Sequence, residues 1–563
     1  MTQPLSLRPW YRELSGYHWF VFTVCTLGWL FDCLDQQLFN IARKPAVTEL
    51  LDVASSDPSV DWYSGVATAM LLIGWATGGI VFGIMGDRVG RAKTMVWTIL
   101  FYSVFTGLSG FSMGLWDFLF YRFMTGLGVG GQFALGVSLV AEVMPDRARP
   151  YALGLLQALS AVGNIAAAAI GMGFNHLEKI DAIHHSAWRW MFSVGIFPAL
   201  LAVVVMSRLK EPERWKKAVA EGVGRQKAGS LRELFGDPRW RRRTIVGMLL
   251  ASAGVIGLWA IGFFSIDLNQ SVFRKIYEAE AREKGEADKD RDLIRLLIDR
   301  PGDLAAVAEK VRPQHFLGLS GSDKDPQRIY AAALRLHAER QPISAENVLQ
   351  ALDEPTADYP AQSKEDRQRR AQYLAGSAPT SGPAAEHVAR VLARQKKING
   401  DAGWWGSITS MLFNIGAFFG IYTFSRVTQR IGRKPAFAAG LVAAMASTAL
   451  AFGCMNSPVE VFWMVPLMGF CQLSLFGGYA IYFPELFPTR LRSTGTSLCY
   501  NIARFAAAAG PFTLGLLTSE VFSEARGFEE PLRYAGVTMC AVFLIGLVVL
   551  PFAPETKDQP LPE

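Results

Sequence analysis

Long apolar runs separated by shorter polar segments dominate this 563-residue chain. A run of about 20 mainly apolar residues is long enough for one helix to cross the hydrocarbon core of a bilayer. The pattern therefore predicts an all-α membrane protein with twelve transmembrane helices. The runs lie at about 17–41, 62–86, 94–114, 116–143, 152–174, 187–208, 244–266, 403–425, 435–455, 458–482, 494–518 and 533–552.

Two of the polar segments are long. The first, 209–243, is basic, and the second, 271–402, is rich in charged residues, Gln and Ala. The second segment contains a Gly-, Ser- and Pro-rich stretch at 376–383 that is typical of a flexible linker. Its other parts show apolar residues every three or four positions, which predicts short helices with one buriable face. These helices are expected at 293–298, 329–336, 345–352 and 387–394.

Composition supports a membrane protein and excludes several other classes. Hydrophobic residues make up 51% of the chain and charged residues 19%, whereas soluble domains carry about 25% charged residues. The sequence has no Gly-x-x-x-x-Gly-Lys-Ser/Thr loop, which excludes an ATP-driven pump, and it has no hydrolase motif or Cys-x-x-Cys pair. We expect neither an enzyme nor a metal or other cofactor.

Basic residues gather in short clusters between the apolar runs, although the net charge is only +7. Such clusters mark the cytoplasmic side of a membrane protein and do not indicate a nucleic-acid surface. Arg43 and Lys44, after the first run, are an exception. We expect a multi-pass protein of the plasma or inner membrane with both termini in the cytoplasm. The 271–402 segment then lies outside, as a small helical cap.

The chain is internally duplicated. The segment 87–93 recurs at 429–434 with an offset of 342 residues, and Glu142–Arg149 recurs as Glu485–Arg492 with an offset of 343. Two six-helix halves are therefore expected, with the substrate site between them near mid-membrane. The predicted organisation is a first bundle at 1–208, a basic linker at 209–243, helix 7 at 244–270, the insertion at 271–402 and the remaining helices at 403–563.

The first repeated segment, Gly83-Ile-Met-Gly-Asp-Arg-Val-Gly-Arg-Ala-Lys93, resembles the loop signature of the major facilitator superfamily. The resemblance implies that Asp87 bridges to an Arg of the other bundle and locks the outward-facing state. A plain positive-inside loop is the alternative. Gln429 replaces the acid in the second copy, so a matching lock there would be weaker. The expected gating residues are Asp87, Arg88, Gly90, Arg91, Glu142, Arg147, Arg433, Glu485 and Arg490.

Within that superfamily the chain resembles the aromatic-acid, niacin and organic-ion proton symporters. Asp32-Cys-Leu-Asp35 is similar to their Asp-Gly-Phe-Asp, and 482–495 is similar to their segment between helices 10 and 11. The polar residues that sugar porters carry in span seven and the Trp they carry in span ten are missing here. The resemblance implies proton-coupled symport of a small organic anion, such as an aromatic or heterocyclic carboxylate.

Three ionisable residues of the first half are candidates for proton coupling. A charge in the hydrocarbon costs about 3 kcal/mol on insertion scales, so its presence indicates a function. Asp32 and Asp35 lie three residues apart and thus on one helix face. In sugar porters the residues that match Asp35 and Arg122 form the coupling pair. We expect Asp35 to carry the proton and release Arg122 when protonated; the alternative is a static salt bridge.

The expected substrate site contains one cation. Arg504, in span eleven, can grip a carboxylate through two parallel hydrogen bonds, although it could instead bond a backbone carbonyl or Asp267. Gln157 and Asn164 lie two helical turns apart on one face, where amides suit substrate groups or bonds between helices. The other candidate contacts are Gln132, Asn414, Tyr482 and Trp259.

Three functions are compatible with the sequence. The first is proton-coupled import of a small organic anion, the second is symport of a sugar or polyol, and the third is a membrane receptor derived from a transporter. The presence of Asp35, Arg122 and both basic loops disfavours the receptor. The expected partners are the bilayer, protons and a small-molecule substrate, with no nucleic acid, and we expect a monomer.

Overall fold

The computed structural model describes most of the chain, and its regular elements are all helices within the described residues. It forms two compact units, one containing Met1–Asn269 with Gly406–Glu563 and the other containing Gln270–Trp405. The described residues are 9–52, 58–180, 182–183, 185–200, 208–213, 215–216, 228–262, 264–286, 289–290, 332–336, 339, 383–522, 526–528 and 530–562.

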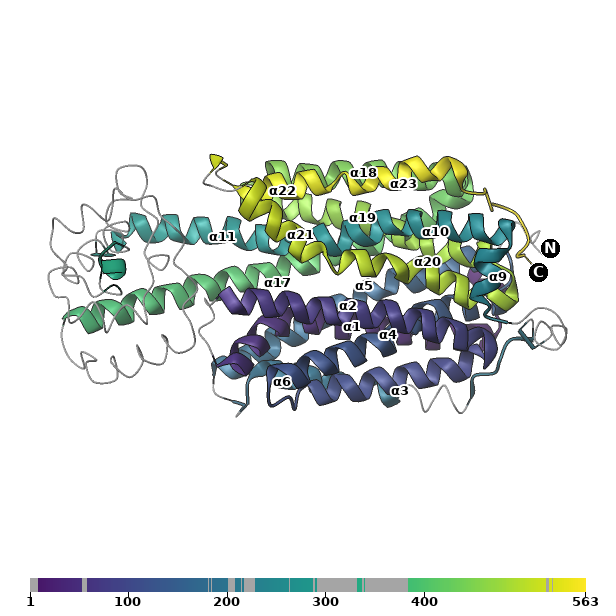
Figure 1. Cartoon of the computed structure of the whole chain (residues 1–563), viewed down its shortest axis with the longest axis horizontal. Helices are drawn as coiled ribbons and strands as arrows, with labels where there is room; N and C mark the ends of the chain where they lie inside the picture. The colour runs from purple at the N-terminus through teal and green to yellow at the C-terminus, as the bar shows by residue number, and fades with distance from the viewer. Residues whose placement is uncertain are drawn as a thin grey trace. The chain divides into compact units, whose positions relative to one another are not determined.

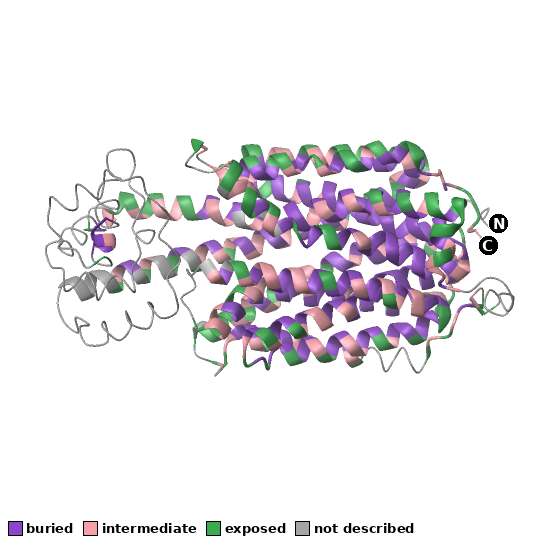
Figure 2. Ribbon diagram, viewed as in Figure 1, coloured by how far each residue is buried: buried purple, intermediate pink, exposed green. Residues whose placement is uncertain are grey.

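The helices of the larger unit lie roughly parallel to one another (Figure 1). Their buried residues face neighbouring helices and their exposed residues face outward (Figure 2). Among the described residues, nine helices are long and apolar enough to cross a membrane. The first half contains η2 (Trp10–Glu13), α1 (Gly16–Leu51), α2 (Pro58–Arg88), α3 (Arg91–Ser109), α4 (Leu115–Val143), α5 (Arg149–Lys179) and α6 (Ala187–Val194).

The second half contains longer and more interrupted helices. It begins with α9 (Leu231–Gly236), α10 (Pro238–Ile256), η3 (Gly257–Gly262, a π-helix) and α11 (Phe264–Glu283). It continues with α17 (Pro383–Ile431), α18 (Arg433–Cys454), α19 (Pro458–Leu486), η6 (Thr489–Leu491), α20 (Arg492–Ala507), α21 (Gly510–Leu516), η7 (Leu517–Val521, a second π-helix), α22 (Pro531–Met539), α23 (Val542–Val549) and η9 (Leu550–Phe552).

Several predicted boundaries are wrong. The first helix does not end near 41 but continues through Pro45 to Leu51. The seventh run starts at Pro238 rather than 244, because Asp237 caps the helix by accepting from the Arg239 backbone N–H at 2.8 Å. The eleventh run is broken between α20 and α21, where Pro511 fixes its own φ angle and lacks an N–H donor. In the sixth run, 201–207 lie outside the described residues.

Glycines set the closest helix contacts. A Cβ at Gly74 or Gly78 of α2 would collide with the α4 backbone, and a Cβ at Gly126 of α4 would collide with the α2 backbone. In the second half, Gly416 and Gly420 of α17 meet the α19 backbone in the same way. Small residues four apart permit this approach in membrane helices. The shared arrangement supports the duplication read from the sequence.

The smaller unit contains the C-terminal part of α11 and the first part of α17. The Trp405 ring of α17 stacks on Phe273 of α11 with centroids 4.8 Å apart, which pairs the two helices. Arg394 of α17 also donates to both oxygens of Asp290, which follows α11, at 2.9 and 2.6 Å. The helix expected at 387–394 lies within α17, and 332–336 is helical inside the segment expected at 329–336. The expected helices at 293–298 and 345–352, with 376–382 of the linker, lie outside the described residues.

Candidate transport site

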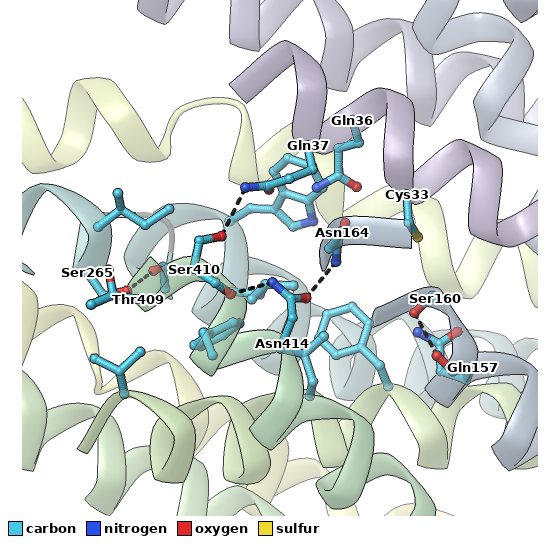
Figure 3. A pocket seen from close by; sticks show the side chains of 18 of the residues that line it. Cys33, Gln36, Gln37, Gln157, Ser160, Asn164, Ser265, Thr409, Ser410 and Asn414 are labelled. Atoms are coloured by element: carbon cyan, nitrogen blue, oxygen red, sulfur yellow. Dashed lines mark hydrogen bonds between the residues drawn. The ribbon is translucent and has the colours of Figure 1, made fainter. Parts of the chain in front are cut away.

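A cavity lies between the two halves of the larger unit (Figure 3). The α1, α2 and α5 helices line it from the first half, and η3, α11, α17, α19 and α20 line it from the second. Five of the predicted substrate contacts are in its lining: Gln157, Asn164, Trp259, Asn414 and Arg504. The position between the halves is the one that the duplication predicted.

Two predicted contacts do not reach this cavity. Gln132 turns toward α3, where its side-chain oxygen accepts from the Thr98 hydroxyl at 2.8 Å. Tyr482 donates its hydroxyl proton to the Pro554 carbonyl at 2.8 Å. Both side chains are buried, and each makes its hydrogen bond within its own half. The helix position was correct in each case, but the rotation of the helix about its axis turns the side chain away.

Amide and hydroxyl groups connect the halves across the cavity. Figure 3 shows the Asn164 amide reaching Asn414 and the Gln37 amide reaching Ser410, at 2.8 and 3.0 Å. Both bonds join a first-half helix to α17, so the alternative role of helix–helix bonding is also observed for Asn164. The sequence interpretation missed Gln37 and Ser410. Their polar character inside apolar runs is the signal that could have found them.

Arg504 is a buried cation of the cavity wall, with 1% of its side chain exposed. Its Nη1 atom donates to the Tyr500 carbonyl at 2.9 Å and to Asn501 Oδ1 at 2.8 Å. The guanidinium also lies over the rings of Trp75 and Tyr500, at 4.1 and 4.5 Å from their centroids. Its Nε has no hydrogen-bond partner in the described structure. The arrangement fixes a planar cation and leaves it able to receive an anion.

The lining holds no carboxylate among the residues that the structure describes. Within the described lining, Arg504 therefore has only uncharged neighbours. The side chain of Asp267, the alternative partner expected from the sequence, lies outside the described residues. A buried charge without an opposite charge nearby is costly. An anionic ligand would supply the missing charge.

The three proton-coupling candidates lie together inside the first half. Asp32, Asp35 and Arg122 are at most 2% exposed, so none faces lipid. Arg122 does not form a direct ion pair with Asp35, although it lies close enough for the two charges to interact. The guanidinium bonds instead to the hydroxyls of Ser109 and Thr125. The expected direct bond is thus replaced by a looser electrostatic contact.

Asp87 accepts hydrogen bonds from the first turn of α20 in the other half. Its carboxylate receives the Ser493 and Thr494 backbone N–H groups at 3.1 and 2.8 Å and the Thr494 hydroxyl at 2.6 Å. The prediction of an Arg from the other bundle was therefore wrong, because Arg91 of its own loop is the ion partner, at 3.2 Å. A helix N-terminus leaves N–H groups free and carries partial positive charge, which suits a carboxylate.

Glu142 provides a second link between the halves. Its Oε1 atom lies 2.8 Å from both Arg91 of the first half and Arg492 of the second. Arg91 also donates to the Thr489 carbonyl at 2.7 Å. Together with the Asp87 contacts, these bonds hold the first half against the second at the repeated loops. We call the set Asp87, Arg91, Glu142 and Arg492 the gate cluster.

The other predicted gating residues bond around the gate cluster. Arg147 pairs with Glu13 at 2.5 Å and Arg490 with Glu233 at 2.6 Å. Arg88 donates to the Ala228 carbonyl at 3.2 Å. In the second half Arg433 pairs with Glu485 at 2.8 Å, which repeats the Arg91–Glu142 pair.

Two glutamates cap the helices that follow the repeated loops, and the sequence interpretation gave them no such role. Glu211 accepts from the Arg91 and Lys93 backbone N–H groups at 2.8 and 3.1 Å. Glu555 accepts from those of Arg433 and Lys434 at 2.9 and 3.1 Å. Burial raises the pKa of the Glu555 carboxyl, but the backbone donors outweigh burial and hold that pKa below its ordinary value.

The sequence profile of the Major Facilitator Superfamily matches residues 25–274 and 391–563. The chain belongs to the Major Facilitator Superfamily. Together with the duplicated twelve-run pattern, this shows the major facilitator fold. The superfamily's proton:xylose symporter XylE, solved with 6-bromo-6-deoxy-D-glucose, superimposes with a TM-score of 0.55 at 15% identity, covering 97% of this chain and 98% of that one. That likeness concerns the fold alone.

Curated relatives include carriers of acids and of sugars. The chain is 30% identical to the niacin transporter NiaP of Acinetobacter baylyi over 198 residues, which is 35% of this chain and 42% of the relative. It is 24% identical to the arabinose-proton symporter of Bacillus subtilis over 250 residues, or 40% of this chain and 53% of the relative. These matches span about half the length of each relative. They show a transporter of this superfamily and leave its substrate open.

Proposed function

We propose that this transporter imports a small organic anion, an aromatic or heterocyclic carboxylate, together with protons. The observation that supports this most is Arg504, a buried guanidinium in the wall of a cavity whose described lining has no carboxylate. A guanidinium binds a carboxylate with two charge-assisted hydrogen bonds, and the unpartnered Nε offers one of the donors. We place the protein in the plasma or inner membrane, as a monomer with cytoplasmic termini and no cofactor.

The rings around Arg504 favour an aromatic substrate. Five aromatic side chains of the lining are Trp29 and Trp75 from the first half and Trp259, Phe476 and Tyr500 from the second. Aromatic rings stack on one another with a gain of about 0.5–1.5 kcal/mol beyond area burial. One cation in the described lining fits a monocarboxylate better than a dicarboxylate, because a second carboxylate would be buried without a partner.

The gate cluster and the proton candidates supply the rest of the cycle. Because the gate cluster is closed, we assign access to the cavity to the opposite face and take that face as the outside. A proton that binds Asp35 would neutralise its carboxylate and end the electrostatic attraction between Asp35 and Arg122. The packing of α1 against α4 would then change. Substrate and proton would then favour opening of the gate cluster, which is alternating access by rocking of two halves.

A sugar or polyol is the second candidate. It is favoured by the number of neutral amides in the cavity wall, since amides donate and accept hydrogen bonds to hydroxyl groups. The amides are Gln36, Gln37, Gln157, Asn164, Asn269 and Asn414. A neutral substrate would not explain why the charged Arg504 is buried in the cavity wall.

Uptake into proteoliposomes under an imposed pH gradient tests the two candidates. Radiolabelled nicotinate, benzoate, cis,cis-muconate, arabinose and xylose are offered in turn, and we expect accumulation of the ring monocarboxylates. Arg504→Lys should raise the KM for the transported acid by about 10- to 100-fold, because it loses the forked hydrogen bonds. Arg533→Lys is the matched control, since that guanidinium bonds to backbone carbonyls of Phe452 and Met455.

Accumulation of sugars without acids would replace the first candidate by the second. An unchanged KM in the Arg504→Lys variant would remove the role of Arg504 in binding the carboxylate.

A further inference from the structure

The α3 helix presents a buried polar face to α1 and α4. Its members Thr98, Tyr102, Thr106 and Ser109 follow one another at four, four and three residues, which places them on one side of the helix. All four are 0% exposed, whereas Val104 on the other side is 55% exposed. A face that looks inward and carries four hydroxyl groups is unusual for an apolar helix.

The two ends of this face have bonding partners and the middle does not. Thr98 donates to Gln132, and Ser109 accepts from Arg122. The hydroxyls of Tyr102 and Thr106 have no hydrogen bond in the described structure. Leaving a buried polar group unbonded costs about 1–3 kcal/mol. The middle of the face therefore indicates a function beyond packing.

The unbonded hydroxyls face the two buried carboxyl groups of α1. Tyr102 is directed at Asp32 and Thr106 at Asp35, and Tyr102 also senses the charge of Asp35. Both oxygens of Asp32 and one oxygen of Asp35 lack a hydrogen bond in the described structure. Each hydroxyl thus lies beside a buried carboxyl that lacks other donors, and neither carboxyl belongs to the described cavity lining.

We propose that Tyr102 and Thr106 relay the coupled proton between Asp35 and Asp32. In the step, protonated Asp35 gives its proton to the Thr106 oxygen, Thr106 gives its own proton to the Tyr102 oxygen, and Tyr102 gives its proton to ionised Asp32. One carboxyl loses a proton, the other gains one, and both hydroxyls end as they began. The proton path then lies within the first half, apart from the substrate cavity. The inference rests on the proton coupling proposed above.

The charged and titratable groups around the relay come from three helices. Asp35 faces Arg122 of α4, and Asp32 faces Asp35 on its own helix and Tyr102 of α3. Cys33 of α1 lies next to Asp32 and also lines the cavity, where it senses the charge of Arg504. Cys33 therefore lies between the proposed proton site and the cavity that contains Arg504.

Infrared difference spectra between acid and neutral pH test the site without any substrate. In the purified protein, Asp32→Asn should remove one protonated-carboxyl band, and Tyr102→Phe should shift that same band because it loses its hydrogen-bonding neighbour. Ser138→Ala is the control, since Ser138 is a buried, unbonded hydroxyl on α4, sixteen residues beyond Arg122. An unshifted band in the Tyr102→Phe protein would overturn the relay.

Transport of radiolabelled nicotinate separates the relay from a structural role. Tyr102→Phe should lower uptake driven by a pH gradient at least about tenfold, while exchange of internal for external nicotinate at equal pH persists. Loss of both activities would show that Tyr102 serves the conformational cycle, and retention of both would also contradict the relay. If the wild-type protein does not transport nicotinate but the band still shifts in Tyr102→Phe, the proposed substrate would be refuted and the relay kept.

Discussion

The two halves share a fold but carry different charges inside the membrane. With an offset of 342 residues, Arg122 of the first half corresponds to Met464 of the second. With an offset of 343, Arg504 of the second half corresponds to Ala161 of the first. All four side chains are buried. The proposed proton site therefore belongs to one half and the proposed anion site to the other, so that proton and substrate meet separate walls of the same transporter.

The repeated loops show the same division on a smaller scale. The helix-capping glutamates and the Arg–Glu pairs occur in both halves with nearly equal distances, 2.8 Å for both ion pairs. Asp87 and Gln429 differ. Asp87 holds the first turn of α20, whereas the side-chain nitrogen of Gln429 has no hydrogen bond in the described structure. The two copies therefore share the capping glutamates and the Arg–Glu pairs, but only the first copy has the carboxylate of Asp87.

The largest effect is expected when the first half receives the residue of the second. Arg122→Met leaves two buried carboxyl groups without their cation, so the proton no longer controls the packing of α1 against α4. We expect uptake driven by a pH gradient to fall by about 100-fold or more. Met464→Leu, at the corresponding position, should stay within about twofold of wild type. Proton-driven uptake that survives Arg122→Met would favour a static structural role.

A smaller effect is expected at the loops. Asp87→Gln copies Gln429 and weakens charge-assisted bonds to α20 worth about 1.5–3 kcal/mol. The closed gate should then be populated less, and the initial uptake rate should fall about tenfold. Labelling of a cysteine placed at Ser497, beneath the gate cluster, should become faster. The reverse change, Gln429→Asp, should alter the rate by less than about twofold, and a comparable loss in both variants would contradict the asymmetry.

The smallest effect is expected where the halves agree. Gly90 and Gly432 have φ angles of 122° and 97°, a conformation that side chains rarely adopt, and each lies against a capping glutamate. Replacing either by Ala should cost about 1–3 kcal/mol and lower the Tm by several degrees. Thermal unfolding in detergent measures both. A stability loss confined to one variant would show that the two caps are not equivalent.

The sequence predicted the helices and the duplication because both depend on local properties. Apolar length defines a membrane helix without reference to any neighbour, and a repeated offset shows two halves before either is folded. The same logic located Arg504, since a guanidinium inside an apolar run has few reasons to be there. The interruptions near Pro511 and at η3 were missed because mean hydropathy does not register a break in backbone bonding.

The direction of each side chain was decided by the tertiary structure. Gln132 and Tyr482 were placed on the correct helices and expected in the cavity, yet they bond elsewhere. Tyr102 and Gln37 were overlooked, yet Tyr102 lies beside the buried carboxyl groups of α1 and Gln37 lines the cavity. A polar residue in an apolar run shows that a partner exists, but the partner depends on how far each helix is rotated about its axis. That rotation is set by glycine contacts between distant segments, such as α2 with α4, and by the bonds that close the gate cluster.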